Sequence, residues 1–431
     1  MKKIVINGTI VTVNDQNEVI HQGALAFEGN RITYIGPTPE DVSLYDEVLD
    51  AKGQIVMPGL VNTHGHAAMS LLRGYADDLP LQEWLETKMW PLEGQFTAEH
   101  VKWGTYLSLI EMLRTGTTSF VDMYDHMDQV AEAVEQTGLR AGLCRGVIGL
   151  CPEEEQKQKL EEATLFAKNW HGQADGRITT MMSPHAPYTC PPDYIRQIVE
   201  KAHELNLPIH IHMSESKREV EQNVADYGLR PPAHLDKLGV FERPTLVAHA
   251  VHLTEEELDL LAERNVHVSH NPISNLKLAS GVAHVPQMLA KGITVSLGTD
   301  SSASNNNLNL FEEIKMAALL HKGVQYNPVV VPADEALRLG TRYGTEAMFI
   351  GNQTGSLEVG KKADFIIVRT DRAHFHPFHD PLSHLVYATS GYDVSDVFVD
   401  GKQLVAKGEL LTIDEEKVIF EANRMFETLE R

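Results

Sequence analysis

Eight short runs of apolar, largely β-branched residues recur through the middle of the chain, and this rhythm restricts the possible folds more than any other feature. The runs lie at 54–62, 117–123, 140–148, 177–183, 207–212, 244–249, 265–270 and 292–298. Longer segments of helical periodicity separate them, and the clearest are 98–114, 127–137, 153–169, 193–205 and 254–263. Strands and helices that alternate eight times are typical of a (β/α)8 barrel. The predicted fold class is therefore α/β, with a TIM-like (β/α)8 barrel at its centre.

The two ends of the chain have a different, β-rich pattern. In KIVINGTIVTV and GALAFEGNRITYIG, both within residues 1–57, apolar residues alternate around Asn7-Gly8 and Gly29-Asn30, two pairs that indicate turns. The segments ADFIIVRT and VSDVFVDGKQLVAKGELLTI repeat this pattern near the other end. We therefore expect both termini to form one small β-sandwich domain.

These patterns predict a discontinuous domain organisation. We expect the β-sandwich domain to combine residues 1–57 with residues 356–431, and the (β/α)8 barrel to occupy residues 58–355. The long segment 71–115 follows the first run, and we expect it to be an insertion that covers the mouth of the barrel.

Composition limits the kind of partner. The formal net charge of −23 argues against a nucleic acid polymer or an anionic membrane, because both attract clustered Lys and Arg. No stretch approaches the ~18 uninterrupted apolar residues of a membrane span. Cys144, Cys151 and Cys190 form neither a CxxC pair nor a disulfide framework. We expect a cytoplasmic protein with a small-molecule partner.

Residues capable of metal binding and catalysis follow several of the eight runs. Active sites of such barrels lie at the carboxyl ends of the strands, so side chains from different runs can meet there. The candidates at these ends are His64, His66, His185, His210, His212, Glu215, His249 and Asp300.

The His64-Gly65-His66 sequence is the clearest metal-binding candidate. Residues two apart on an extended strand face the same side, so both imidazoles can bind one ion. Imidazole suits Zn²⁺ and neighbouring ions, and an open catalytic site needs about three protein ligands plus water. His212 and Asp300 are able to complete the set from the opposite wall.

Other histidines have a structural interpretation. A second HxH pair, His374 and His376 in AHFHPFHD, is expected to lie in a surface or interdomain loop. We expect His252, His267 and His270 to serve packing or hydrogen bonding at strand ends.

Four segments, PGLVNTHGH, HIHMSE, VAHAVHL and SLGTDSSASNNNLNLFEE, resemble the metal-site segments of the amidohydrolase superfamily. The resemblance covers nearly the whole chain. Three further segments resemble one group within this superfamily, the 5′-methylthioadenosine/S-adenosylhomocysteine deaminases. They are SPHAPYT, LRGYADDLPLQEWL and WPLEGQFT. Two-metal members use a carboxylated lysine after the fourth strand, where this chain has MMSPHAPYT. The resemblance therefore implies one divalent metal ion, with zinc favoured, held by His64, His66, His212 and Asp300.

The resemblance also implies hydrolytic deamination of the adenine ring, giving an inosyl product and ammonia. Catalytic roles fall on Glu215 as proton shuttle, on His249 as the group that orients the attacking oxygen, and on Asp300 as proton acceptor. The implied substrates are 5′-methylthioadenosine and S-adenosylhomocysteine, with adenosine as a further candidate. Glu215 and Asp300 would also contact the substrate.

Three other residues are implied in substrate binding. Glu93 matches a carboxylate that accepts both ribose hydroxyls, and His185 one that reaches the purine or ribose. Arg145 matches a residue that meets the homocysteine carboxylate, although a strand-end salt bridge explains it nearly as well. Some relatives carry a second arginine where this chain has Lys157, so the preferred tail stays open. Related proteins form dimers or tetramers, and we expect a homo-oligomer.

Two alternatives remain at this point. One keeps the chemistry but changes the ring, to guanine, a triazine or another aminated heterocycle. Glu93 discriminates, because a ribose-binding carboxylate has no use without a ribose. The other is a non-catalytic scaffold that reuses the barrel, and the retention of all four candidate ligands argues against it.

Overall fold

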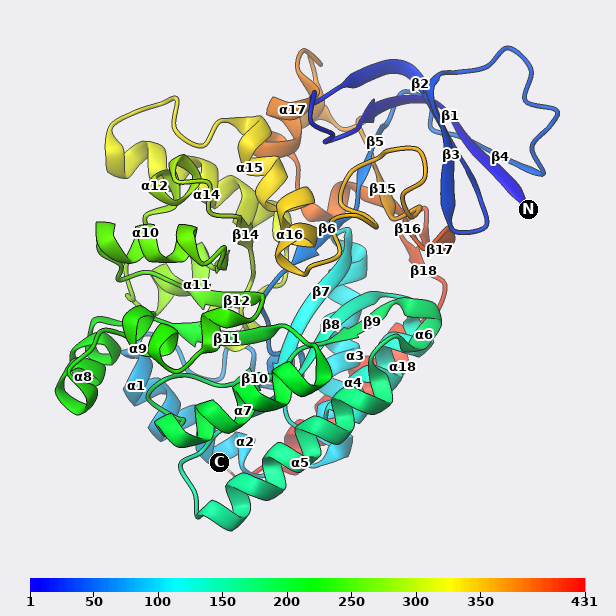
Figure 1. Cartoon of the computed structure of the whole chain (residues 1–431). Coiled ribbons are helices and arrows are strands. Elements are labelled where there is room, and N and C mark those ends of the chain that lie inside the picture. Colours follow the sequence, from blue (N-terminus) through cyan, green and yellow to red (C-terminus); the bar gives the residue numbers. More distant parts are fainter. Residues whose placement is uncertain (431) are drawn as a thin grey trace.

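The computed structural model describes residues 1–430, and a ring of parallel strands lies at its centre (Figure 1). One parallel sheet contains β6 to β10 and a second contains β11 to β14. These strands are β6 (Leu60–Asn62), β7 (Thr117–Tyr124), β8 (Arg140–Val147), β9 (Ile178–Thr180), β10 (Ser183–Pro184), β11 (Ile209–Met213), β12 (Thr245–His249), β13 (His267–His270) and β14 (Val295–Leu297).

Hydrogen bonds across both gaps close the two sheets into a barrel. At one gap the His210 amide donates to the Met182 carbonyl at 3.0 Å, and at the other the Thr63 amide donates to the Leu297 carbonyl at 2.9 Å. Strands β9 and β10 both pair with β8 and share the fourth position of the ring. All eight predicted runs supply barrel strands, and the predicted (β/α)8 barrel is confirmed.

The run at 54–62, predicted as one strand, is two strands in different sheets. β5 (Ile55–Pro58) pairs with strands of the terminal sheet, whereas β6 begins two residues later in the barrel. The break falls at Gly59, where an added Cβ would lie 2.0 Å from the Thr118 hydroxyl oxygen. An apolar run predicts that the chain is extended, but it does not predict which sheet the strand joins.

Helices cover the outside of the barrel, and the five predicted ones end within one residue of their expected limits. They are α3 (Ala98–Arg114), α4 (Met127–Thr137), α5 (Glu153–Trp170), α7 (Pro192–Leu205) and α10 (Glu255–Glu263). In α4, Val130 and Val134 are fully buried while Glu132 and Glu135 face solvent, as helical periodicity requires. The other barrel helices are α8 (Lys217–Tyr227), α9 (Pro231–Lys237), α11 (Pro272–Lys277), α12 (Val285–Ala290), α13 (Ser302–Asn305), α14 (Leu310–Gln325), α15 (Ala333–Leu339) and α16 (Arg342–Ala347).

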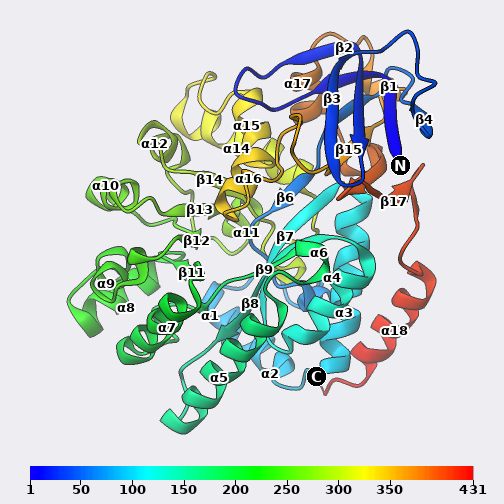
Figure 2. The same cartoon turned by 45° about the vertical axis from the view of Figure 1, so that its right-hand side comes forward.

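Both termini join in one nine-stranded sheet beside the barrel (Figure 2). Its path runs β18-β17-β16-β15-β5-β1-β2-β3, and β4 pairs with β1. The Phe27 ring on β2 lies 5.6 Å from Phe365 on β15 and 6.0 Å from Phe398 on β16, although β1 and β5 separate these strands. The sheet therefore folds back over its own core, and the expected β-sandwich of both termini is confirmed. Besides β5, its strands are β1 (Lys2–Val11), β2 (Val19–Glu28), β3 (Arg31–Pro37), β4 (Glu47–Asp50), β15 (Phe365–Val368), β16 (Val394–Val399), β17 (Lys402–Ala406) and β18 (Glu409–Leu410).

Of the two predicted turns in this domain, one is confirmed and one is wrong. Gly29 and Asn30 connect β2 to β3, with Gly29 at a φ of 58°. Asn7 and Gly8 instead lie inside β1, where the register with β2 shifts and Asn7 has a φ of 56°. Some β-bulges place a residue in the same left-handed region that a tight hairpin turn uses, so Asn-Gly suits either.

Short helical segments lie between β6 and α3, and α3 itself is a barrel helix. The segments are η1 (Ala67–Leu72), α1 (Leu81–Trp84), η2 (Leu85–Met89) and α2 (Trp90–Glu93).

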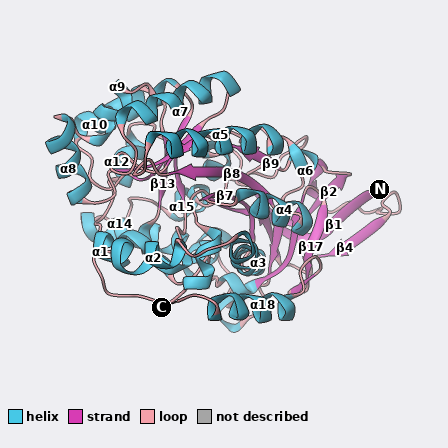
Figure 3. Cartoon of the chain, turned by 90° about the horizontal axis from the view of Figure 1, so that it is seen from below, coloured by secondary structure: helices cyan, strands magenta, loops and turns pink. Residues whose placement is uncertain are grey.

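The last helix, α18 (Glu415–Glu427), packs along α3 (Figure 3), where Lys417 Nζ lies 5.8 Å from the centre of the Trp103 ring. The remaining short segments are α6 (Gln173–Gly176), η3 (Val240–Glu242), η4 (Ala373–Phe375), α17 (Pro381–Ser383), η5 (His384–Ala388) and η6 (Gly391–Asp393). Across residues 1–430 the helices are too short or too polar to cross a membrane.

Candidate active site

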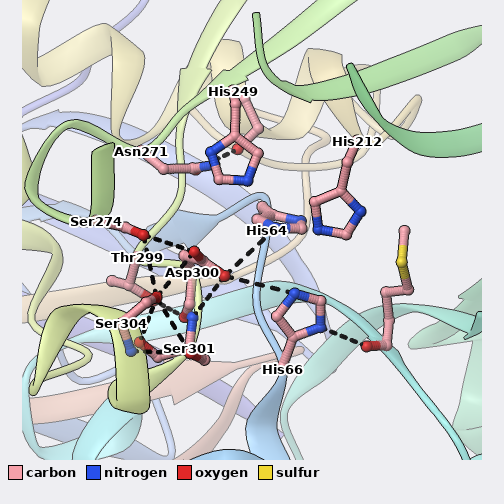
Figure 4. A network of polar contacts seen from close by, with 12 residues as sticks. His64, His66, His212, His249, Asn271, Ser274, Thr299, Asp300, Ser301 and Ser304 are labelled. Carbon is pink, nitrogen blue, oxygen red and sulfur yellow. Dashed lines mark hydrogen bonds and ion pairs between the residues drawn. The ribbon is translucent and has the colours of Figure 1, made fainter. Parts of the chain in front are cut away.

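Five side chains converge at the carboxyl ends of the barrel strands (Figure 4). His64 and His66 follow β6, His212 and His249 lie at the ends of β11 and β12, and Asp300 follows β14. In two overlapping sets, one potential ligand atom per residue lies within 4.8 Å of the others. The sets are His64, His66 and His212, and His64, His249 and Asp300.

A relay of hydrogen bonds determines which nitrogen of His64 faces this space. His210 lies a layer deeper, as expected, and its Nδ1–H donates to the Leu246 carbonyl at 2.9 Å. The His210 Nε2 must then be an acceptor, and it lies 3.0 Å from His64 Nδ1, which donates to it. His64 Nε2 keeps its lone pair, is buried, and has no hydrogen-bond partner among residues 1–430.

Backbone carbonyls orient two more imidazoles in the same way. The Nδ1–H of His66 donates to the Met123 carbonyl at 2.6 Å, and that of His212 to the His185 carbonyl at 2.8 Å. Both Nε2 atoms are consequently free to bind an ion. Such outer contacts hold a ligand ring in its binding orientation and tautomer.

Asp300 completes the cluster from β14. Its Oδ1 lies 3.6 Å from His64 Nε2 and 3.4 Å from His66 Nε2, while Oδ2 accepts the hydroxyls of Ser274 at 2.6 Å and Ser304 at 2.8 Å. Burial raises the pKa of this carboxyl, but neighbouring imidazoles and the two hydroxyls outweigh burial and hold the pKa below its usual value. Asp300 is therefore a carboxylate, held at a left-handed φ of 60°.

This donor set fits a divalent cation. Burial, followed by the neighbouring imidazoles, keeps the pKa of His64 and of His212 well below the usual histidine value. The two rings are neutral at pH 7, which is the form that binds a metal. Neutral imidazoles, one carboxylate and the unsatisfied His64 Nε2 match the ligands that zinc and similar ions prefer.

Glu215 and His249 lie together beside the cluster. Glu215 Oε2 is 3.7 Å from His249 Nε2, and both residues are buried. Burial, and then the nearby Asp300 carboxylate, raise the pKa of Glu215 to about 8. The shortest contact of His249 Nδ1 is with Asn275 Oδ1, at 2.8 Å. Because an amide oxygen can only accept, the His249 Nδ1–H donates to it, and Nε2 is the accepting nitrogen. The pair thus presents a protonated acid and an imidazole nitrogen to the same space.

A cavity of about 300 Å³ opens directly above the cluster. Leu81, Trp84, Leu85 and Trp90, from the segments between β6 and α3, form one apolar wall. These side chains show that the segment expected to cover the mouth does line the cavity. Its size is at the lower end of the usual range for small-molecule sites, ~300–1,000 Å³.

Glu93, at the end of α2, lines this cavity. The Tyr124 hydroxyl donates to Glu93 Oε1 at 2.6 Å, and burial raises the pKa of Glu93. Tyr124 was not among the predicted site residues, although a phenol at the carboxyl end of β7 was a usable signal. Asn275, Ser274 and Ser304, which support His249 and Asp300 from outside the cluster, were not predicted either.

The structure brings His185 and Arg145 to the cavity as well. His185 Nδ1 lies 3.0 Å from the Thr189 hydroxyl, and burial lowers the pKa of His185 to about 3. Arg145 already forms ion pairs with Asp125 at 3.2 Å and Glu162 at 3.0 Å. Arg145 therefore forms the strand-end salt bridge considered above and also lines the cavity.

The histidines expected to be structural lie away from the cluster. His374 and His376 are exposed, whereas His267 and His270 are the buried first and last residues of β13. His252 donates from Nε2 to the Ser280 carbonyl at 2.7 Å. Lys157 is exposed and does not line the cavity. Lys159, which forms an ion pair with Glu155 one helical turn earlier, does line it.

Known proteins share both the sequence and this architecture. The sequence signature of the amidohydrolase family matches residues 55–404. A 5-methylthioadenosine/S-adenosylhomocysteine deaminase from Halalkalibacterium halodurans is 50% identical over 435 residues, which cover 100% of this chain and 99% of that protein.

Solved structures agree. An adenosine deaminase from Xanthomonas campestris with bound zinc superposes with a TM-score of 0.93 at 34% identity, covering 99% of both chains. A triazine hydrolase from Arthrobacter aurescens superposes with a TM-score of 0.92 at 25% identity, again over 99% of both chains. On the family signature and on relatives that match its whole length, this chain belongs to the amidohydrolase family.

Proposed function

We propose that the protein is a metal-dependent enzyme that deaminates the adenine ring of 5′-methylthioadenosine, S-adenosylhomocysteine and adenosine by hydrolysis. Two relatives, one 50% and one 34% identical to this chain, are deaminases, and both are named for adenosine compounds. The structural support is a cluster of neutral imidazoles and a carboxylate at the base of a cavity that also contains a buried acid.

One zinc ion is the proposed cofactor, and His64, His66, His212 and Asp300 would hold it. The free Nε2 of His64 and the carboxylate of Asp300 fit this role, and the Xanthomonas campestris relative contains zinc. When bound, such an ion supplies the Lewis acidity that makes water reactive at neutral pH.

The proton transfers fall to the protein's own residues. Asp300 accepts a proton from the attacking water, and His249 Nε2, kept an acceptor by Asn275, orients the attacking oxygen. Glu215, protonated in its buried position, donates to the ring nitrogen beside the attacked carbon. A C–O bond forms, the C–N bond breaks and ammonia leaves. Of the two water protons, one leaves with the amine and the other restores the Glu215 acid.

The carboxylate of Glu93 is the observation that favours a nucleoside over a free base. Tyr124 holds one of its oxygens from the protein side, and the carboxylate faces the cavity, where it can accept both ribose hydroxyls. His185 would contact the purine or ribose, and Trp84 and Trp90 would cover an uncharged thioether tail. Arg145 would meet the carboxylate of a homocysteine tail.

A triazine or another aminated heterocycle is the second candidate, since a triazine hydrolase shares this fold. The domain limits 1–57, 58–355 and 356–431, a homo-oligomeric state and a cytoplasmic location stay predictions.

Ammonia release separates the two candidates. Metal-analysed protein is assayed on 5′-methylthioadenosine, S-adenosylhomocysteine, adenosine, adenine, guanine and an aminotriazine. Glu93→Ala should abolish nucleoside turnover, and Glu86→Ala, an exposed glutamate in the same region, should not. Turnover of free bases or the triazine alone, unaffected by Glu93→Ala, would refute the proposed substrate.

A further inference from the structure

Glu219, a buried glutamate outside the converging cluster, has an unusual set of hydrogen bonds. Its side chain is 2% exposed, and it projects from the first turn of α8. Oε1 accepts the backbone N–H of Ser214 and Oε2 that of Glu215, both at 2.8 Å. One carboxylate thus holds two consecutive amides of the loop that carries the proposed acid.

The neighbouring loop shows what such a glutamate ordinarily does. Glu257 occupies the N3 position of α10 and accepts the N–H of the N-cap residue, Thr254, at 2.8 Å, which is a standard capping box. Glu219 occupies the same N3 position of α8, after the N-cap Ser216. Its carboxylate reaches past the N-cap to the two preceding residues. It therefore fixes the catalytic loop rather than the start of the helix.

The loop needs this support because its backbone is strained. Ser214 has a left-handed φ of 52° without being glycine, a conformation that residues with a Cβ disfavour. The Ser214 carbonyl accepts the N–H groups of Val251 and His252 at 3.1 and 3.0 Å, which ties this loop to the one that follows His249. Glu219 satisfies the amide on the other side of the same turn. The direction in which Glu215 leaves the backbone is consequently fixed from both sides.

We propose that Glu219 is a positioning residue, which aims the Glu215 carboxyl at the reacting ring by holding the Ser214 and Glu215 amides. An isosteric amide cannot do this, because a Gln side chain has one accepting oxygen and would face the second N–H with its own NH₂ group. Since Glu215 has its role only under the proposed function, the role of Glu219 rests on that function too.

The test compares E219Q with E257Q, E215Q and the E215Q/E219Q double variant. For each protein, kcat, KM, bound metal per chain and the thermal midpoint are measured on a compound that the wild type turns over. We expect E219Q to lower kcat at least about 30-fold, with KM and metal content within about threefold, because small misplacements of a reacting group cost up to ~10²-fold. E257Q, which also loses part of the pairing with Arg230, should lower the thermal midpoint but leave kcat within about threefold.

The double variant separates positioning from general stability. With Glu215 already replaced, E219Q should lower the residual kcat by less than about threefold, because Glu219 then has no acid to aim. A 30-fold loss in that background, or a wild-type kcat in E219Q, would overturn the proposal. If E219Q does not fold, E219D keeps the carboxyl group but is too short to reach both amides, and wild-type kcat in E219D overturns the proposal equally.

A crystal structure of E219Q gives a readout that does not depend on turnover. The Glu215 carboxyl should leave its position 3.7 Å from His249 Nε2. An unchanged loop would contradict the role of Glu219 even if the wild type were inactive on every nucleoside. Inactivity on nucleosides would refute the proposed function alone.

Discussion

Tyr124→Phe is the most informative single substitution outside the converging cluster. It removes only the hydroxyl that donates to Glu93 Oε1 at 2.6 Å and leaves the ring in place. Burial already raises the pKa of Glu93, and the Tyr124 hydrogen bond opposes that rise. Without the hydroxyl, the carboxylate loses both its orientation and part of its ionisation.

The size of the effect follows from that hydrogen bond. A bond to a charged acceptor contributes about 1.5–3 kcal/mol, which corresponds to roughly 10- to 150-fold in kcat/KM. We expect a loss in this range for 5′-methylthioadenosine and adenosine, measured by ammonia release. A compound without ribose should be affected less than about threefold, because Glu93 does not contact it in the proposed complex.

The matched control is Tyr106→Phe, which removes a hydroxyl bonded to Gln136 at 2.5 Å on the outside of the barrel. It should leave kcat/KM unchanged for every compound. An equal loss on nucleosides and on ribose-free rings would mean that Tyr124 acts on the site in general. No loss on nucleosides would refute the ribose role of Glu93.

Three further predictions concern the metal, the fold and pH. His64→Ala should leave the purified protein with less than about a tenth of the wild-type zinc by elemental analysis, because it removes one of the four proposed ligands. Arg140→Met leaves the buried Asp364 carboxylate, which lies 2.8 Å from Arg140 Nε in the wild type, without its ion-pair partner. The substitution should lower the free energy of unfolding by about 3–5 kcal/mol in urea titrations. Arg264→Met removes one partner of an exposed ion pair and should have little effect. Burial raises the pKa of Glu313 from 4.5 to about 8, so its contribution to stability is complete below pH 4.5 and is lost as pH rises through 8. Glu313→Gln should therefore show a smaller decrease in unfolding free energy between pH 6 and pH 9 than the wild type, and an unchanged slope would contradict this.

The Arg140 ion pair also shows where sequence reasoning stops. Arg140 begins β8 in the barrel, whereas Asp364 precedes β15 in the terminal sheet, so 224 residues separate the partners. Each residue alone is an ordinary charged residue at a strand end. Only the packing of the two domains makes them a buried pair.

The fold itself was largely predictable, because periodicity is a local property. Strands and helices of the barrel follow from apolar spacing over six to seventeen residues, and α3, α4, α5, α7 and α10 end within one residue of their predicted limits. The two local failures have a common cause. Gly59 and Asn7-Gly8 each permit more than one backbone arrangement, and distant partners, Thr118 and β2, select among them.

Sequence alone determined which residues could meet at the candidate active site, since His64, His66, His212, Glu215, His249 and Asp300 all lie at or just after strand ends of one barrel. The tertiary structure alone decided how each is held: His210 turns His64, Tyr124 holds Glu93, and Asn275 sets the tautomer of His249. Glu219 belongs to this second class, although it lies only four residues from Glu215. The spacing of residues along a strand or helix is set by backbone geometry that every chain shares. The contacts between side chains of separate segments depend on register and packing, which exist only once the whole barrel has closed.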